Sequence, residues 1–235
     1  MNSRPSSSSS TPTRAEQVFT LYAAIFIAFL VIAQIISSKH FLFRGSPLSC
    51  RDAIYPITLL VTNIVTEVYG LKQAKILVMS GLFVSILVAA LTWIANNVPI
   101  ATTSPVDAAA FAKVFGYLPS VVVSTLVAYL IAQLLNLYLF EWLRALTKRK
   151  QLWLRSNGAT LCAQLVDTVL FLAVLGVIGP VLNGHLQSQP INQPPTGLSI
   201  GLARYTFKGL ITLGGTPFVY AGVQLAHRWI GSQNH

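Results

Sequence analysis

Long apolar runs separated by short polar stretches divide the chain into six segments. A helix needs about 20 apolar residues, each rising about 1.5 Å, to cross the roughly 30 Å hydrocarbon core of a bilayer. The segments that meet or approach this length are Val18–Ser37, Ile54–Tyr69, Ala74–Ala95, Tyr117–Leu143, Gly158–Gly179 and Tyr205–Ile230. The pattern predicts an all-α integral membrane protein with six transmembrane helices in one bundle.

Two segments depart from a plain membrane helix. Segment Ile54–Tyr69 spans only about 24 Å at 1.5 Å per residue, contains Pro56 and stops at Gly70. The last segment contains Lys208 and the Gly214-Gly215 pair. We therefore expect the second helix to be short and the sixth to be interrupted. Such helices line substrate sites in transporters, and an embedded helix without a ligand is the alternative.

The composition supports a membrane protein. Of the 235 residues, 54% are hydrophobic and 9% are charged, whereas a soluble domain has about 25% charged residues. A net charge of +10 would indicate nucleic-acid binding in a soluble protein. Here the basic residues lie between apolar segments, and no basic stripe alternates with aromatic residues. The expected partner is the lipid bilayer, with no nucleic acid.

The positions of the basic residues predict the orientation of the chain. With the first residues inside the cell, most Lys and Arg residues lie on the inner side, including the run Lys148-Arg149-Lys150. Both termini are therefore expected in the cytoplasm. Residues 1–14 are rich in Ser, Thr and Pro, which is typical of a disordered tail, and residues 15–235 form the transmembrane domain.

A nine-residue phrase occurs twice, at Ala132–Phe140 and at Ala163–Phe171, with five positions identical. Asn136 in the first copy aligns with Asp167 in the second, and each follows a Gln by three residues, on the same helix face. Polar side chains at membrane depth usually face a bundle interior or a wet cavity. The repeat predicts that two neighbouring helices each direct a polar pair at a shared site.

Four of the predicted helices carry polar residues at helical spacing. The members of these faces are Asn63 and Glu67, then Thr125, Tyr129, Gln133 and Asn136, then Thr160, Gln164 and Asp167, and last Tyr205, Lys208, Thr212 and Thr216. A buried charge costs about 3 kcal/mol, whereas an interhelical hydrogen bond returns about 0.6 kcal/mol.

The ionisable residues Glu67, Asp167 and Lys208 therefore point to an ion pair, to a substrate site, or to both, and an uncharged residue could simply join helices. Lys208 is expected to pair with Asp167 or Glu67. Asp52, next to Arg51, is expected to form a surface pair at the outer mouth.

No enzyme motif competes with this interpretation. The motifs HExxH, GxSxG, GxGxxG and the Walker A motif are absent, and the four His residues lie near segment ends or in loops. We expect no enzymatic activity, no cofactor and no metal.

Ten short phrases follow one another along most of the chain. They are Tyr55-Pro56-Ile57-Thr58, Val61-Thr62-Asn63, Thr66-Glu67-Val68-Tyr69-Gly70, Phe115-Gly116, Ala128-Tyr129, Ala132–Asn136 with Phe140, Leu152–Arg155, Gln164–Thr168 with Phe171, Tyr205 with Phe207-Lys208, and Thr216-Pro217. Together these phrases resemble one family, the queuosine precursor transporters, also called the vitamin uptake transporter family. In order and spacing they cover the chain from about Ile54 to Tyr220. The family commonly has Asp at the positions of Asn63 and Asn136, so this chain lacks two carboxylates there.

The resemblance implies a multi-pass importer in the bacterial inner membrane. Its substrates would be 7-deazaguanine bases, such as 7-cyano-7-deazaguanine, 7-aminomethyl-7-deazaguanine and queuine, for queuosine salvage. The resemblance also implies six helices, as in the substrate-binding components of energy-coupling-factor transporters, and leaves the energy-coupling partner open.

Each polar residue has an expected role if the substrate is such a nucleobase. Asp167 or Glu67 accepts the adjacent ring N–H and amino donors as a bidentate pair. A donor for the ring carbonyl comes from Gln133, Asn136, Gln164 or Lys208, and Tyr129 or Tyr205 stacks on the ring. Two alternatives remain, a proton-coupled carrier of another small solute and a non-catalytic membrane assembly subunit.

Overall fold

The computed structural model describes residues 12–116, 118–182 and 197–231. Its elements are α1 (Arg14–Ile35), the 3-10 helix η1 (Ile36–Ser38), β1 (His40–Phe43), β2 (Ser46–Ser49), α2 (Arg51–Tyr69), α3 (Leu71–Asn97), α4 (Ala108–Phe115), α5 (Leu118–Leu146), α6 (Leu152–Leu182), α7 (Gly197–Gly214) and α8 (Thr216–Gly231). The prediction of an essentially helical chain is confirmed.

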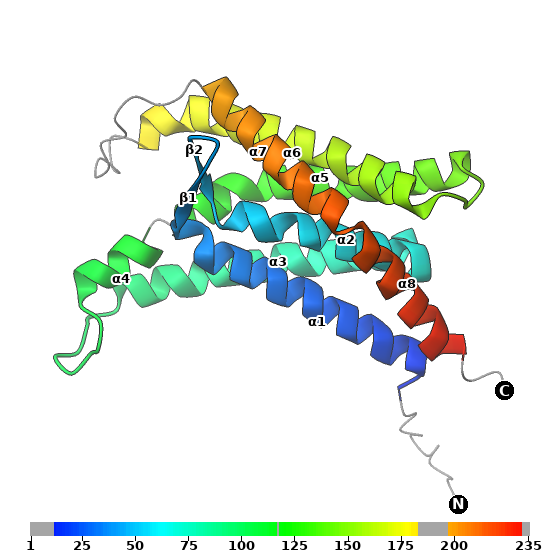
Figure 1. Ribbon diagram of the computed structural model, residues 1–235. Helices are drawn as coiled ribbons and strands as arrows, with labels where there is room; N and C mark the ends of the chain where they lie inside the picture. Colours follow the sequence, from blue (N-terminus) through cyan, green and yellow to red (C-terminus); the bar gives the residue numbers. More distant parts are fainter. Residues whose placement is uncertain (1–11, 117, 183–196, 232–235) are drawn as a thin grey trace, which may run out of the picture.

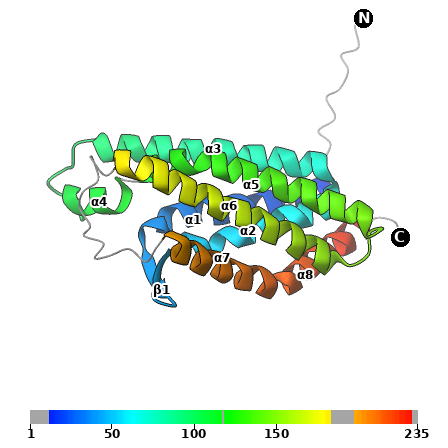
Figure 2. The ribbon, with the colours of Figure 1, turned by 90° about the horizontal axis from the view of Figure 1, so that it is seen from above.

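The long helices lie side by side in a bundle (Figure 1). Helices α1, α2, α3, α5 and α6 each run along it, and α7 and α8 follow one another along it, as the second view also shows (Figure 2). The start of α1 and the end of α8 lie at the same end of the bundle, while α4 and the β1–β2 hairpin lie at the other. We call these the terminal end and the hairpin end.

The distribution of polar and apolar residues is the reverse of that in a soluble protein. Phe83 and Phe218 are 68% and 75% exposed, whereas the side chains of Asn63 and Gln133 are completely buried. Large exposed apolar areas are rare on soluble monomers and fit a lipid-facing surface. The stretches Arg14–Ser38, Leu71–Asn97 and Thr125–Leu146 of the described residues are long and apolar enough to cross a membrane. The chain is therefore a membrane protein.

Helix α2 occupies the centre of the bundle and contacts α1, α3, α5, α6, α7 and α8. It begins at Arg51, three residues before the predicted start, and its 19 residues make it shorter than α1, α3, α5 and α6. Gly70 ends it with a φ of +82°, a left-handed value that glycine adopts without strain, and α3 follows at once. Because neighbours surround α2, its polar side chains can find partners only within the protein or in a ligand.

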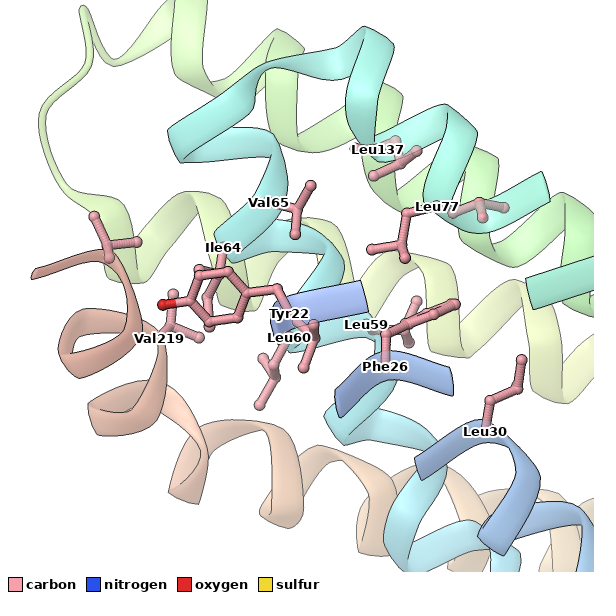
Figure 3. Packing of buried hydrophobic residues seen from close by; sticks show 14 of the residues in the cluster. Tyr22, Phe26, Leu30, Leu59, Leu60, Ile64, Val65, Leu77, Leu137 and Val219 are labelled. Carbon is pink, nitrogen blue, oxygen red and sulfur yellow. The ribbon is translucent and has the colours of Figure 1, made fainter. Parts of the chain in front are cut away.

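An apolar core joins α2 to α1, α3, α5 and α8 (Figure 3). Its members include Tyr22, Phe26, Leu59, Ile64, Leu77, Leu137 and Val219. The Tyr22 hydroxyl donates to the Gly222 carbonyl across 2.7 Å, which ties α1 to α8. The core holds one side of α2, and its other side carries the polar contacts described below.

The predicted interruption of the last helix is present, because α7 ends at Gly214 and α8 starts at Thr216. Gly215 lies between them, where a Cβ atom would overlap the Leu60 side chain of α2. A larger residue there would push α7 and α8 away from the central helix. The break therefore lies where the last helix packs against Leu60 of α2.

Two features were not predicted, the short helix α4 and the hairpin. The strands pair antiparallel from His40 opposite Ser49 to Phe43 opposite Ser46. Phe41 and Phe43 contact the ring of Phe207, with ring centroids 5.2 and 5.1 Å away. The hairpin, which directly precedes α2 in the chain, therefore packs against α7.

Most of the predicted tail, residues 1–11, lies outside the residues that the structure describes. Thr13 caps α1 by accepting a hydrogen bond from the Glu16 amide, and the Glu16 carboxylate accepts from the Thr13 amide. Helix α1 accordingly begins at Arg14, the last residue assigned to the tail.

Candidate functional site

Two buried amides form the centre of a polar network between α2, α5 and α6. Asn136 Nδ2 donates to Asn63 Oδ1 across 2.8 Å. Asn63 Nδ2 in turn donates to Ser156 Oγ and Thr160 Oγ1, at 3.0 and 2.9 Å. Thr160 closes the ring by donating its hydroxyl to Asn136 Oδ1 at 3.2 Å. Each amide oxygen and nitrogen of the pair therefore has a partner.

Gln133 extends this amide network by one turn. Its Nε2 donates to Thr58 Oγ1, and its Oε1 accepts from Thr62 Oγ1, at 3.3 and 3.4 Å. Both threonines lie on α2, so the first copy of the repeated phrase faces the central helix. Every side-chain nitrogen and oxygen atom of Asn63, Gln133 and Asn136 therefore has at least one partner within the protein.

The second copy of the phrase faces a different helix. Asp167 Oδ2 accepts from Lys208 Nζ of α7 across 2.7 Å, and Gln164 Nε2 donates to Thr212 Oγ1, also across 2.7 Å. The predicted ion pair between Lys208 and Asp167 is present. The two copies do not meet at one point, because the first binds α2 and the second binds α7.

A second carboxylate, Asp52 at the start of α2, joins this ion pair. Arg204 Nη2 lies 2.7 Å from Asp52 Oδ1, and Lys208 Nζ lies 3.6 Å from the same oxygen. The Ser49 amide donates to Asp52 Oδ2 across 3.3 Å. The prediction of a surface pair with Arg51 is wrong, since Asp52 is 1% exposed and its partners come from α7.

The resulting ion cluster consists of Asp52, Asp167, Arg204 and Lys208. Two negative and two positive groups balance, which is what makes their burial tolerable. Each of the four residues is less than 10% exposed. Among the described residues, no three His, Cys, Asp or Glu side chains gather in a way that could hold a metal ion.

Two buried polar atoms next to the ion cluster have no hydrogen-bond partner among the residues that the structure describes. They are the amide oxygen Oε1 of Gln164 and the hydroxyl of Tyr55. Gln164 lies one turn before Asp167 on α6, and the ring of Tyr55 lies 5.3 Å below Lys208 Nζ. Unpartnered buried polar atoms are costly, and in a binding protein they are candidates for contact with a ligand.

Glu67 belongs to another ion pair, at the terminal end of α2. Arg155 Nη1 and Nη2 bind its two carboxylate oxygens at 3.0 and 3.2 Å. Arg144 Nε lies 3.7 Å from the same carboxylate. Glu67 is 15 residues from Asp52, or about 22 Å along the helix, so it does not share a site with Asp167.

The two candidate tyrosines lie apart from each other. Tyr129 is buried, and its hydroxyl donates to the Val78 carbonyl of α3 at 3.2 Å. Tyr205 lies on α7, one turn before Lys208, and is partly exposed. Of the predicted site residues, the structure thus gathers Gln164, Asp167 and Lys208 in one place and Asn63, Gln133 and Asn136 in another.

Sequence reasoning missed Asp52, Tyr55 and Arg204. A signal for each was available, because Asp52 and Tyr55 are three residues apart on α2 and Arg204 is four residues before Lys208 on α7. The prediction started the second helix at Ile54 and the sixth at Tyr205, and so left Asp52 and Arg204 in loops.

Comparison with known proteins identifies the family of the chain. Residues 52–222 match the family model described as "Putative vitamin uptake transporter". A curated protein of Bacillus subtilis (strain 168), described as "Probable queuosine precursor transporter", is 28% identical over 184 residues, which are 77% of this chain and 74% of that protein. No solved structure matches the chain. Since the family model covers more than half of the chain, this protein belongs to the vitamin uptake transporter family.

Proposed function

We propose that this transporter imports queuosine precursors, the 7-deazaguanine bases, across the inner membrane. The family match and the description of the Bacillus subtilis relative support a small-molecule substrate of this class. Within the molecule, one observation carries the proposal. A buried carboxylate, Asp167, lies beside two buried polar atoms that have no partner, on Gln164 and Tyr55.

The chemistry of a 7-deazaguanine fits this arrangement. The base has adjacent ring N–H and amino donors, a carbonyl acceptor and a flat apolar face. Asp167 accepts both donors in a bidentate pair once Lys208 moves aside. The Tyr55 hydroxyl then donates to the ring carbonyl, and Gln164 Oε1 accepts the second hydrogen of the amino group. A few convergent polar groups in an apolar surround are typical of small-ligand sites.

The other predicted site residues have supporting roles in this proposal. Asn63, Gln133 and Asn136 join α2 to α5 and α6, and so fix the frame on which α7 moves. Glu67 anchors the terminal end of α2 through Arg155. Tyr205, one turn from Lys208, is the aromatic residue for stacking on the base, while the Tyr129 hydroxyl is engaged by α3.

We further propose that six spans cross the membrane, formed by α1, α2, α3, α5, α6 and the pair α7–α8. An even number of crossings agrees with the start of α1 and the end of α8 lying at one end of the bundle. The basic run Lys148–Lys150 between α5 and α6 assigns that end to the cytoplasm. Alternating access then comes from movement of the interrupted α7–α8 pair against the amide network.

An uptake assay tests the proposal. Cells that make no queuosine precursors and have no transporter of their own receive the wild-type chain, Asp167→Asn or the control Glu141→Gln. Glu141 pairs with Arg144 at the terminal end, where its side chain is 42% exposed. We expect uptake of labelled 7-cyano-7-deazaguanine by the wild type and the control, and a rate lower by about 100-fold in Asp167→Asn, which loses a buried charged acceptor.

The outcomes separate the alternatives. Wild-type uptake by Asp167→Asn, at equal protein level, would remove Asp167 from the site. Failure of guanine, 7-cyano-7-deazaguanine, 7-aminomethyl-7-deazaguanine and queuine to compete for a bound label would indicate a carrier of another solute. A purified chain that binds none of these bases would support an assembly subunit.

A further inference from the structure

We propose that Asp52 is a positioning residue that accepts Lys208 when Asp167 releases it to bind the substrate. The inference rests on the proposed function and adds a residue that lies outside the repeated phrase. In this mechanism Lys208 exchanges one carboxylate for another, and the ion cluster keeps its charge balance throughout.

The geometry already places Lys208 between two acceptors. Its Nζ lies 2.7 Å from Asp167 Oδ2 and 3.6 Å from Asp52 Oδ1. The lysine side chain is a flexible four-carbon stem that ends in a compact ammonium group. A small change in its torsion angles therefore moves the ammonium group from one carboxylate oxygen to the other. The Tyr55 ring, 5.3 Å from Nζ, offers its face to the cation along the way.

A bidentate ligand of Asp167 competes with Lys208. A ring N–H and an amino group each take one carboxylate oxygen, and Oδ2 already accepts from Lys208 Nζ at 2.7 Å, so the ligand would have to share that oxygen with a buried cation. Releasing Lys208 into a buried space without another carboxylate would leave an uncompensated charge, which is strongly unfavourable. Asp52 supplies the counter-charge that a released Lys208 needs, because it is buried and its Oδ1 lies 3.6 Å from Lys208 Nζ.

Asp52 is held in place independently of Lys208. Arg204 binds its Oδ1 at 2.7 Å, and the Ser49 amide at the end of the hairpin donates to its Oδ2. In this mechanism Lys208 is therefore the member of the cluster that moves. At the terminal end, by contrast, Arg155 binds both oxygens of Glu67 and has no second carboxylate within ion-pair distance among the described residues.

Equilibrium binding of 7-cyano-7-deazaguanine to purified protein in lipid nanodiscs tests the inference. The set contains the wild type, Asp52→Asn, Lys208→Met and the double variant, with Glu141→Gln as the control. We expect Asp52→Asn to raise the Kd about tenfold, because Lys208 then stays on Asp167. In the Lys208→Met background the same substitution should change the Kd less than about twofold, because no lysine competes for Asp167.

This non-additivity separates positioning from a merely structural role. If Asp52 only supports the fold, Asp52→Asn weakens binding by the same factor in both backgrounds, and the inference fails. It also fails if Asp52→Asn binds with the wild-type Kd. A wild type that shows no saturable binding of any 7-deazaguanine contradicts the proposed function instead.

A second variant keeps the test decisive if Asp52→Asn does not fold. Arg204→Gln removes the fixed partner of Asp52, so Asp52 attracts Lys208 more strongly and Asp167 becomes more available. We expect the Kd to fall by about threefold, in the opposite direction to Asp52→Asn. A higher Kd in Arg204→Gln, with the melting temperature preserved, overturns the inference.

Discussion

Helices α5 and α6 carry nearly the same nine-residue phrase and use it differently. In α5, Gln133 and Asn136 bond to threonine and asparagine side chains of α2. In α6, Gln164 and Asp167 bond to Thr212 and Lys208 of α7. The helix opposite each phrase, rather than the phrase itself, decides whether the polar pair is neutral or charged.

The difference teaches how to separate polar residues that hold helices together from candidates for ligand contact. Burial does not separate them, because Gln133 and Gln164 are both completely buried. Satisfaction of hydrogen bonds does, since both amide atoms of Gln133 have partners and Oε1 of Gln164 has none. Three sets of substitutions test this difference between the two helices.

The largest effect is expected in the amide network of α5. Asn136→Leu removes the partner of Asn63 Oδ1 and the acceptor of the Thr160 hydroxyl. Orphaned buried polar groups should lower the free energy of unfolding by about 3 kcal/mol, measured by denaturation in detergent. Asn136→Asp, which keeps the shape and changes the charge, is the companion variant. A stability equal to that of the wild type in Asn136→Leu would show that the network is not structural.

The two glutamines form a matched pair. Gln133→Leu removes two hydrogen bonds and should cost about 1–2 kcal/mol of stability. Gln164→Leu removes one hydrogen bond and one unpartnered oxygen, so its unfolding free energy should stay within about 0.5 kcal/mol of the wild type. The substrate Kd should rise about tenfold in Gln164→Leu alone. Equal effects of both variants on stability and on Kd would show that Gln133 and Gln164 do not differ in role.

The smallest effect is expected for Tyr55→Phe. This change removes the unpartnered hydroxyl and keeps the ring beside Lys208. Stability should not fall, because no hydrogen bond within the described residues is lost. The Kd for 7-cyano-7-deazaguanine should rise about three- to tenfold through loss of the donor to the ring carbonyl. An unchanged Kd would exclude the hydroxyl from the proposed site.

The helical fold was largely predictable because it depends on local pattern. Apolar runs of membrane length gave the long helices, and the Gly214-Gly215 pair gave the interruption. An ion pair of Lys208 with Asp167 or Glu67 was predictable as well, since buried charges need a counter-charge, and the structure shows that the partner is Asp167. The hairpin was missed because its strands are only four residues long.

The partners of Asp52 and Arg155 were not predictable, because they are contacts between distant parts of the chain. Asp52 and Arg204 are 152 residues apart, and Glu67 and Arg155 are 88 residues apart. Next to Arg51, Asp52 resembles a solvated pair, and Arg155 follows the basic run of a loop. Only the packing of α2 against α6 and α7 shows that these charges are buried.

The order of these charges along the chain has a consequence for synthesis. In each buried pair the carboxylate precedes its cation, with Glu67 before Arg155, and with Asp52 and Asp167 before Arg204 and Lys208. A ribosome therefore delivers each of these carboxylates to the membrane before its cation. We expect the cations of α6 and α7, which are costly at membrane depth, to meet these counter-charges as they insert. We therefore expect nascent α2, with Asp52 and Glu67, to guide the insertion of the helices that follow it.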